Sequence, residues 1–325
     1  MKNLKIVVTD YIEPDLNWEA AELAKRGLHF LYHQLKFAPR EQVIAATRDA
    51  DIVIVNMLPV TPDLIAGWEK CRLVIRHGVG YDNVDLAALD KAGIPLCYIP
   101  DYCVEEVAEQ AIALMLACGR KLISSRKVLE DSSARGRWDF TDVIPIFRIA
   151  GRTVGIIGCG RIGSRVYQKL QSFGVKFLIC DPYLTEERKR ELGIEVVDKE
   201  TVFRGADFVT IHTPLTHETR HIANAQTLAM MKPTAYLINA SRGPMVDDEA
   251  LAEALRNCLI AGAAIDVYGT EPPPPGYPLF GLPNVILTPH LAWYSEEGGW
   301  RIRELIILEI DRFLAGLPPR YVAQP

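Results

Sequence analysis

A glycine-rich segment in the middle of the chain has the spacing of a dinucleotide-binding turn. An apolar, β-branched run, 153–157, leads into the pattern G-x-G-x-x-G formed by Gly158, Gly160 and Gly163, and a helical pattern follows. In such a turn the first glycine allows the tight bend, the second lets a pyrophosphate approach the backbone, and the third lets the helix pack on the strand. The phosphates are then expected on the first amides of the helix, those of Arg161 and Ile162.

An acidic residue at the end of the next predicted strand indicates which dinucleotide to expect. The glycine motif alone would suit an ordinary strand-to-helix turn equally well. Asp181, however, follows Gly163 by 181 − 163 = 18 positions, where a carboxylate can accept hydrogen bonds from both ribose hydroxyls and repel a 2′-phosphate. Pro182 and Tyr183 come next, so no arginine is at hand for that phosphate. The sequence therefore predicts NAD as the cofactor, in preference to NADP.

Three later residues could take part in acid–base chemistry or bind a carboxylate. Arg242, Glu271 and His290 each follow a predicted strand of one sheet by a few residues. Because ligands bind at the carboxyl ends of parallel strands, the three side chains are expected to converge there. A histidine by itself would more often be structural, and it is the two partners that favour a catalytic role. Thr213 follows another of these strands and is predicted to line the cofactor pocket.

The elements that position these residues are those of an α/β fold. Short β-branched runs alternate with helical patterns along the chain, which is typical of parallel sheets joined by crossover helices. Six runs follow residue 150, as many as a doubly wound dinucleotide-binding sheet requires. The predicted strands are 6–8, 52–55, 73–75 and 96–99 in a first sheet, and 154–157, 176–180, 207–211, 235–239, 261–265 and 285–288 in a second.

Helical patterns divide the chain into two predicted domains. An apolar segment, Val104–Cys118, is predicted as a buried helix that bridges them. Residues 131–150 show no clear period and are predicted as a connection on the surface or against another subunit. The last helix, 295–315, has apolar positions over more than one narrow stripe and is predicted to pack back across the first domain. The predicted domains are 1–100 together with 293–325, for the substrate, and 101–292, for NAD.

Composition and charge exclude several classes of protein. The 325 residues, 49% of them apolar and 24% charged, suit two globular domains. The charge balance of 36 − 41 = −5, without a basic segment interleaved with aromatics, speaks against nucleic-acid binding. No apolar run approaches the roughly 18 residues of a membrane span, so a cytoplasmic protein is expected. The seven cysteines form neither C-x-x-C pairs nor clusters with histidine, and no disulfide or metal site is predicted.

Together these motifs resemble the D-isomer-specific 2-hydroxyacid dehydrogenase family over essentially the whole chain. The resemblance rests on Arg242, Glu271 and His290 in this order, and on a glycine motif preceded by about 150 residues. Within the family, the segment that runs from His290 through Trp293 to Glu296 is similar to the C-terminal binding proteins and their bacterial relatives. The resemblance implies a flavodoxin-like substrate or lid domain with a Rossmann NAD-binding domain inserted in it.

The resemblance also implies a reaction, the NAD-dependent transfer of hydride between a 2-keto acid and a D-2-hydroxy acid. His290 would exchange the proton with the substrate oxygen, Glu271 would orient the imidazole and stabilise its charged form, and Arg242 would bind the substrate carboxylate. Asp266 would reach the nicotinamide amide, although it would also suit a local turn. The further cofactor contacts expected are Thr213, Ala240, Arg242, Asp266 and His290.

The first domain is expected to complete the substrate site through a glycine-rich loop. By the resemblance, the amides of Val79 and Gly80 face the substrate carboxylate, and Arg76 adds a positive charge. His77 departs from the family, which often has a small or apolar residue there, and could alter substrate preference. Beyond the catalytic histidine, Trp293 would line the pocket and favour a substrate with an apolar side chain.

A second interpretation is an NAD-sensing, corepressor-like interaction module with weak or no turnover, which the branch of the family permits. The intact set of arginine, glutamate and histidine favours the enzyme. The resemblance further implies a homodimer, formed through the helix at 104–118 and the connection after it. The expected partners are thus a small 2-keto or 2-hydroxy acid and a second copy of the chain, with no nucleic acid, membrane or metal.

Overall fold

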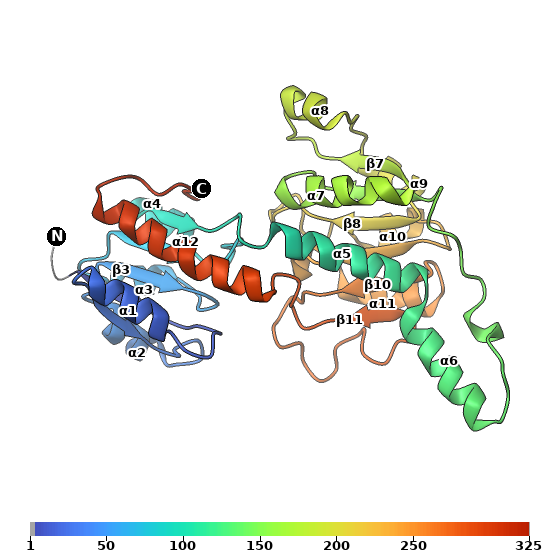
Figure 1. Ribbon diagram of the computed structural model, residues 1–325, viewed down its shortest axis with the longest axis horizontal. Coiled ribbons are helices and arrows are strands. Elements are labelled where there is room, and N and C mark those ends of the chain that lie inside the picture. Colours follow the sequence, from blue (N-terminus) through green and yellow to red (C-terminus); the bar gives the residue numbers. More distant parts are fainter. Residues whose placement is uncertain (1–3, 325) are drawn as a thin grey trace. The chain divides into compact units, whose positions relative to one another are not determined.

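The computed structural model describes residues 4–324 and divides into two compact units (Figure 1). Unit 1 comprises Met1–Cys103 and Ser295–Pro325, and unit 2 comprises Val104–Tyr294. The chain leaves unit 1 once and returns to it once, so unit 2 is an insertion in unit 1. Both boundaries lie within three residues of the predicted ones.

Unit 1 is built on a parallel sheet of five strands, β1 (Lys5–Val8), β2 (His29–Tyr32), β3 (Ile52–Val55), β4 (Leu73–Arg76) and β5 (Leu96–Tyr98). Their order is β2-β1-β3-β4-β5, the order of flavodoxin-like folds. Four of these strands are the predicted ones. The prediction lacks β2, because this edge strand, His-Phe-Leu-Tyr, has no β-branched residue and exposes both of its ends.

The helices of unit 1 are α1 (Asn17–Lys25), α2 (Arg40–Thr47), α3 (Pro62–Ala66), α4 (Leu86–Ala92) and α12 (Glu296–Leu314). In Figure 1, α1 and α12 lie side by side, and both pack on one face of the sheet. There Ile6, Ile54 and Ile75 of the strands meet Ile302 and Ile306 of α12 in one buried apolar core. The other face packs on α3 and α4 through a second core. The last helix therefore returns to the first domain, as predicted.

Unit 2 contains a parallel sheet of six strands, β6 (Thr153–Ile157), β7 (Lys176–Cys180), β8 (Phe208–Ile211), β9 (Tyr236–Asn239), β10 (Gly262–Ile265) and β11 (Val285–Leu287). The order is β11-β10-β9-β8-β6-β7, and a parallel bridge between Ile179 and Val196 extends the sheet beyond β7. With Val196 counted as a very short strand, this is the Rossmann order, with its switch point between β6 and β8. The predicted α/β class and all six predicted strands are confirmed.

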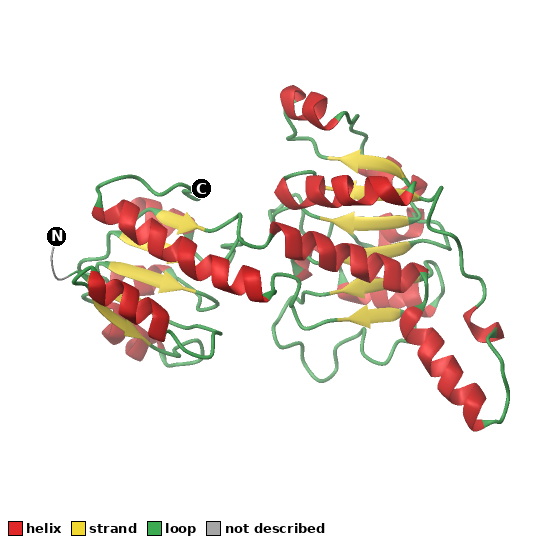
Figure 2. Ribbon diagram, viewed as in Figure 1, coloured by secondary structure: helices red, strands yellow, loops and turns green. Residues whose placement is uncertain are grey.

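The helices of unit 2 are α5 (Val104–Gly119), α6 (Leu122–Ala134), α7 (Arg161–Leu170), α8 (Glu186–Leu192), α9 (Lys199–Gly205), α10 (Ala225–Met230) and α11 (Asp248–Arg256). As Figure 2 shows, α5 and α7 cover one face of the sheet, and α9, α10 and α11 pack on the other. The prediction that α5 bridges two domains is wrong, because the whole helix belongs to unit 2 and buries Ala111 and Met115 on its sheet. Within residues 4–324, no helix is long and apolar enough to cross a membrane.

The segment between α5 and β6 also differs from the prediction. Lys121 adopts a left-handed conformation, with φ at 52°, and separates α5 from α6. Helix α6 continues to Ala134, into the 131–150 range that was predicted to be irregular. Only Ser132 is buried in this helix, so no apolar stripe marks it in the sequence. The remainder of the range is irregular apart from a short 3₁₀ turn, η1 (Thr141–Val143).

Candidate active site

The turn between β6 and α7 has the backbone geometry that its glycines require. Gly158 has a φ of +88°, a left-handed conformation that side chains disfavour. A Cβ at Gly163 would lie 2.0 Å from the carbonyl oxygen of Gly158, so only glycine lets the helix pack this closely. A Cβ at Gly160 would meet no described atom within 4 Å, and Gly160 caps α7 without a side chain. The open space at this helix end suits a phosphate bound by the amides of Arg161 and Ile162.

Asp181 lies beside the same turn, at the carboxyl end of β7. One of its carboxylate oxygens accepts a hydrogen bond from the amide of Cys159, 2.8 Å away, and the other accepts one from the amide of Tyr183, 3.0 Å away. Cys159 stands between the first two glycines of the motif, so these bonds fix the carboxylate next to the turn. At this position a carboxylate can hydrogen-bond the ribose that is attached to a bound pyrophosphate.

His290 and Glu271 form a close pair. The imidazole Nδ1 lies 2.8 Å and 2.9 Å from the two carboxylate oxygens of Glu271, although 19 positions separate the residues in the chain. With Nδ1 facing a carboxylate, the neutral imidazole carries its proton on Nδ1, and Nε2 is left as the atom that exchanges a proton. The imidazole side chain is 35% exposed, so it is open to a ligand.

The charge of Glu271 is set by its neighbours. Burial raises the pKa of Glu271, but the hydrogen bond and charge of His290, the amide of Tyr268 and the charge of Arg242 outweigh this effect. The pKa of Glu271 therefore lies below its usual value, and the group is a carboxylate near neutral pH. Tyr268 also donates from its hydroxyl to the carbonyl of Thr288, 2.9 Å away, and so links the two loops that carry the pair.

The loop that bears His290 is held by Asp266. The Asp266 side chain is fully buried, and its carboxylate accepts hydrogen bonds from the Thr288 hydroxyl and from the amides of Leu291 and Ala292. His290 itself has a left-handed φ of 52°, and its amide donates to the carbonyl of Asp266, 2.7 Å away. These partners lie 22 to 26 positions further along the chain, so Asp266 braces the loop after β11 and not a local turn of its own. Its contact with the nicotinamide amide stays a prediction.

Arg242 is held next to the same loops because the backbone of its neighbour, Gly243, packs against the backbone of Tyr268. A Cβ at Gly243 would lie 2.0 Å from the carbonyl carbon of Tyr268, so the two backbones are in direct contact. The segment is braced by Asn239, whose amide nitrogen donates to the carbonyl of Arg242, 2.8 Å away, and by the Ser241 hydroxyl, which donates to the end of β8. Arg242, Glu271 and His290 therefore lie together in unit 2, at the carboxyl edge of the sheet that carries the glycine turn.

Two further predicted cofactor contacts lie near that edge. A Cβ at Gly158 would meet the Thr213 methyl carbon at 2.6 Å, which places Thr213 against the glycine turn. Ala240 is buried directly after β9. The residue before Thr213, His212, is part of the packing under the turn: burial lowers its pKa to about 4, and Nε2 lies 2.9 Å from the Thr210 hydroxyl.

Trp293 is partly buried and packs edge-to-face on Tyr294, with ring centroids 5.2 Å apart. It follows His290 by three positions, in the last residues of unit 2. An indole at this position adds an apolar surface to the segment that carries His290.

The predicted substrate loop belongs to unit 1 and follows β4. Arg76 donates from its guanidinium to the Asn56 side chain, 3.2 Å away, and to the carbonyl of His77. Among residues 4–324, none accepts a hydrogen bond from the amides of Val79 or Gly80. These two amides are therefore suited to bind a carboxylate.

Several residues that hold the site are absent from the sequence-based prediction. Tyr268 and Asn239 brace the catalytic segments, and Asp10 braces unit 1 with amides 46 to 48 positions away. Two of them carry a local signal: Asn239 ends β9 and Tyr268 stands two residues after Asp266. Asp10 follows β1 by two residues, but its partners become evident only once the strand order is known.

Comparisons with known proteins show what this chain is similar to. The family model for the NAD-binding domain of D-isomer-specific 2-hydroxyacid dehydrogenases matches residues 112–292. A glyoxylate reductase of Korarchaeum cryptofilum is 35% identical over 93% of this chain and 94% of its own length. A D-3-phosphoglycerate dehydrogenase of Methanocaldococcus jannaschii is 37% identical over 85% of this chain, which spans only 52% of that protein.

Among solved structures, a D-lactate dehydrogenase of Aquifex aeolicus, complexed with NAD and lactic acid, superposes with a TM-score of 0.83. The two proteins are 28% identical, and the match covers 96% of each chain. The similarity therefore extends over both units of the present structure.

Proposed function

Because the chain belongs to the D-isomer-specific 2-hydroxyacid dehydrogenase family, we propose that it is an NAD-dependent oxidoreductase that interconverts a 2-keto acid and a D-2-hydroxy acid. The observation that carries the proposal is the His290–Glu271 pair, at 2.8 Å, on the same sheet edge as the glycine turn. A proton-exchanging group and a dinucleotide site at one edge are the two requirements of this reaction. The alternative of an NAD-sensing module is not favoured, since the named relatives are reductases and dehydrogenases and the catalytic set is intact.

The residues of unit 2 fit NAD. The amides that follow Gly160 would bind the pyrophosphate, Gly163 keeps the helix close enough for them to do so, and Asp181 would accept the ribose hydroxyls. Thr213 and Ala240 would line the pocket beyond the turn. When bound, the nicotinamide supplies the hydride or accepts it.

In the direction of reduction, His290 gives a proton from Nε2 to the oxygen of the keto group, and in oxidation it takes this proton back. Glu271 holds the ring through Nδ1 and stabilises the imidazolium, because its low pKa keeps it a carboxylate throughout. Asp266 fixes the segment from which the ring projects. Glu271 orients the ring and is not the base.

The carboxylate of the substrate is assigned to Arg242, whose planar guanidinium can donate two parallel hydrogen bonds. For unit 1, the family resemblance assigns the amides of Val79 and Gly80 and the guanidinium of Arg76 to the substrate carboxylate. Trp293 favours substrates with an apolar side chain. A 2-keto acid with a short or branched aliphatic chain is therefore the expected substrate class.

The test is turnover of NADH with a panel of 2-keto acids, from glyoxylate through pyruvate to longer aliphatic ones, on the whole chain. We expect reduction of keto acids, with the highest kcat/KM on the members whose aliphatic side chain is larger than that of pyruvate. Arg242→Lys keeps the charge but loses the fork, and should raise KM more than tenfold on every member. Tight binding of NADH without turnover of any member would contradict the proposal.

We also propose that the enzyme is a homodimer that pairs through α5, α6 and the segment after them. This part of unit 2 exposes several large apolar side chains, a pattern that marks protein interfaces. Trp138→Ser should shift the dimer towards monomer in sedimentation experiments, and a wild-type monomer would refute the assignment. The apolar side chains and their exposed fractions are Leu122 (57%), Ile123 (64%), Trp138 (84%), Phe140 (59%) and Ile144 (57%).

A cytoplasmic location completes the proposal. The seven cysteines all lie within residues 4–324, where the structure has no disulfide, and five of them are buried, as suits a reducing compartment in which NADH is recycled. Fractionation of the source cells tests this location: the protein should be recovered with cytoplasmic markers, and recovery with envelope markers would contradict it.

A further inference from the structure

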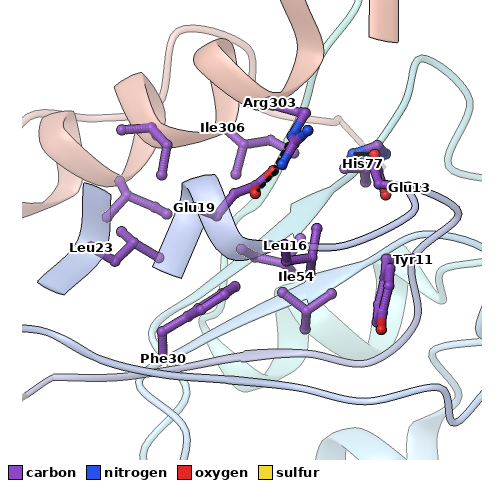
Figure 3. Close-up of a pocket in the computed structure, with 13 residues that line it drawn as sticks. Tyr11, Glu13, Leu16, Glu19, Leu23, Phe30, Ile54, His77, Arg303 and Ile306 are labelled. Atoms are coloured by element: carbon purple, nitrogen blue, oxygen red, sulfur yellow. Dashed lines mark hydrogen bonds and ion pairs between the residues drawn. The ribbon is translucent and has the colours of Figure 1, made fainter. Parts of the chain in front are cut away.

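The loop after β4 contains a histidine to which the proposed reaction gives no role. His77 directly follows the strand, and its amide donates to the carbonyl of Val55 at the end of β3, 2.8 Å away. Its imidazole lines a small, largely apolar cavity of unit 1, where it faces Glu13 (Figure 3). Glu13 lies in the loop between β1 and α1, so the two side chains connect two separate loops at the carboxyl edge of the sheet.

The Glu13–His77 contact is short and shielded from solvent. His77 Nε2 lies 2.9 Å from Glu13 Oε1, and the two side chains are only 12% and 10% exposed. Burial raises the pKa of Glu13, but the hydrogen bond and charge of His77 outweigh this effect and lower the pKa to about 2. Glu13 is therefore a buried carboxylate whose main partner is the histidine of the glycine-rich loop.

No other cationic side chain drawn in Figure 3 pairs with Glu13 in place of His77. The cation of α12 that lines the cavity, Arg303, is bound to Glu19 through two hydrogen bonds of 2.5 Å and 2.6 Å, and its guanidinium lies over the ring of Trp300. Arg303 and Glu19 thus largely neutralise each other, although Arg303 still contributes a weak attraction for Glu13. The remaining lining is mostly apolar, which strengthens the pair.

The loop that carries Glu13 is a firm anchor. Its first part contains the buried Asp10, whose carboxylate accepts hydrogen bonds from the amides of residues 56, 57 and 58, after β3. The far end of the glycine-rich loop is held to the same segment, because the Asn83 side chain donates to the carbonyls of Asn56 and Leu58. Between the attachments at His77 and Asn83 lie the amides assigned to the substrate.

We propose that the Glu13–His77 pair positions the loop for the carboxylate of the substrate, so that His77 sets the affinity for the keto acid. The inference rests on the proposed function, since the loop meets a substrate only if the chain is such an enzyme. Two adjacent amides must aim at one carboxylate, and a small displacement of the loop weakens both hydrogen bonds at once. His77 is a positioning residue: it acts through Val79 and Gly80 and touches neither the proton nor the hydride.

The experiment compares His77→Ala, Glu13→Ala and the double variant in the keto-acid assay. Each single variant should raise KM on the order of tenfold, with kcat within about twofold and an unchanged Kd for NADH. Because the residues act as one unit, the double variant should be no worse than either single one. His77→Gln keeps an N–H donor and should restore most of the affinity. An unchanged KM in the single variants, or additive losses in the double variant, would overturn the proposal.

Hydrogen exchange separates this inference from the proposed function. His77→Ala should speed exchange of the amides of His77 and Gly78, which donate to the carbonyls of Val55 and Arg76, whereas His29→Ala, at an exposed histidine on the edge strand, should not. If the wild type reduces no 2-keto acid, the proposed function fails, and the exchange data still decide whether the pair holds the loop. Equal exchange in His77→Ala and wild type refutes the pair's role, whatever the enzyme assay shows.

Discussion

The glycine turn allows a prediction in which two similar substitutions have different effects. Gly160→Ala and Gly163→Ala each add one methyl group to the same motif, three residues apart. At Gly160 the new Cβ meets no described atom within 4 Å and φ is −68°, so the protein accommodates it. At Gly163 the Cβ would lie 2.0 Å from the Gly158 oxygen, and contacts below 3.0 Å are not tolerated, so α7 and β6 must separate by at least 3.0 − 2.0 = 1.0 Å.

The magnitudes follow from what each methyl group displaces. Overpacking of this kind costs about 1–3 kcal/mol, and one kcal/mol lowers the Tm of a domain of this size by about 2–4 °C. Gly163→Ala should therefore lose that stability. Gly160→Ala should lose at most about 1 kcal/mol, through the poorer helix cap. Its methyl group instead occupies the space assigned to the pyrophosphate, and about 1–3 kcal/mol there weakens NADH binding by about 5- to 150-fold.

The assays are thermal unfolding and a fluorescence titration with NADH. Gly276→Ala is the matched control, because its Cβ also meets no described atom within 4 Å and it lies outside the motif. It should change neither measurement. If Gly160→Ala binds NADH as tightly as the control does, the phosphate does not lie at this helix end and the assignment of the cofactor site is wrong.

The remaining predictions concern charge and shape. His290→Gln should lower kcat by about 10²–10⁴-fold with NADH binding unchanged, and a near-normal rate would remove the imidazole from the mechanism. Asp181→Ala should reduce the preference for NADH over NADPH in kcat/KM; unchanged selectivity would count against its ribose contact. Trp293→Ala should impair bulky, branched keto acids more than pyruvate, and equal losses would refute its role in the pocket. Glu13, with a pKa lowered from 4.5 to about 2, contributes about 3 kcal/mol of stability that is present above pH 4.5 and lost as the pH falls towards 2. In Glu13→Gln the free energy of unfolding should therefore fall less steeply with pH across this range. An acid transition identical to that of the wild type would refute the contribution.

Much of the fold could be predicted because its signals are local. The buried parallel strand 52–55 is an unbroken β-branched run, 154–157 is one apart from Gly155, and both fall at the predicted positions. The edge strand β2 and the helix α6 were not predicted, because neither buries a full face and neither therefore carries a regular apolar pattern. Secondary structure at the surface leaves a weaker trace in the sequence than secondary structure in the core.

Some contacts of the site could likewise be predicted from the sequence, and others could not. His290 and Glu271 could be paired from the sequence, because each follows a strand of one sheet by a few residues and parallel strands bring such ends together. Nothing local indicates that Glu13 meets His77, which lies 77 − 13 = 64 positions further along the chain. That contact depends on the strand order β1-β3-β4, together with the path of two loops. Asp266 is a further example, since its place after β10 could be predicted, but its three partners after β11 depend on the pairing of these two strands.

The most direct test of the proposed chemistry is the configuration of the product. Wild-type protein, NADH and an aliphatic 2-keto acid should yield the D-2-hydroxy acid, one molecule for each NADH oxidised, as resolved by chiral chromatography. Two results would contradict the proposal that His290, held by Glu271, protonates the keto oxygen beside the cofactor. One is formation of the L-isomer. The other is binding of NADH without any consumption of NADH or of the keto acid.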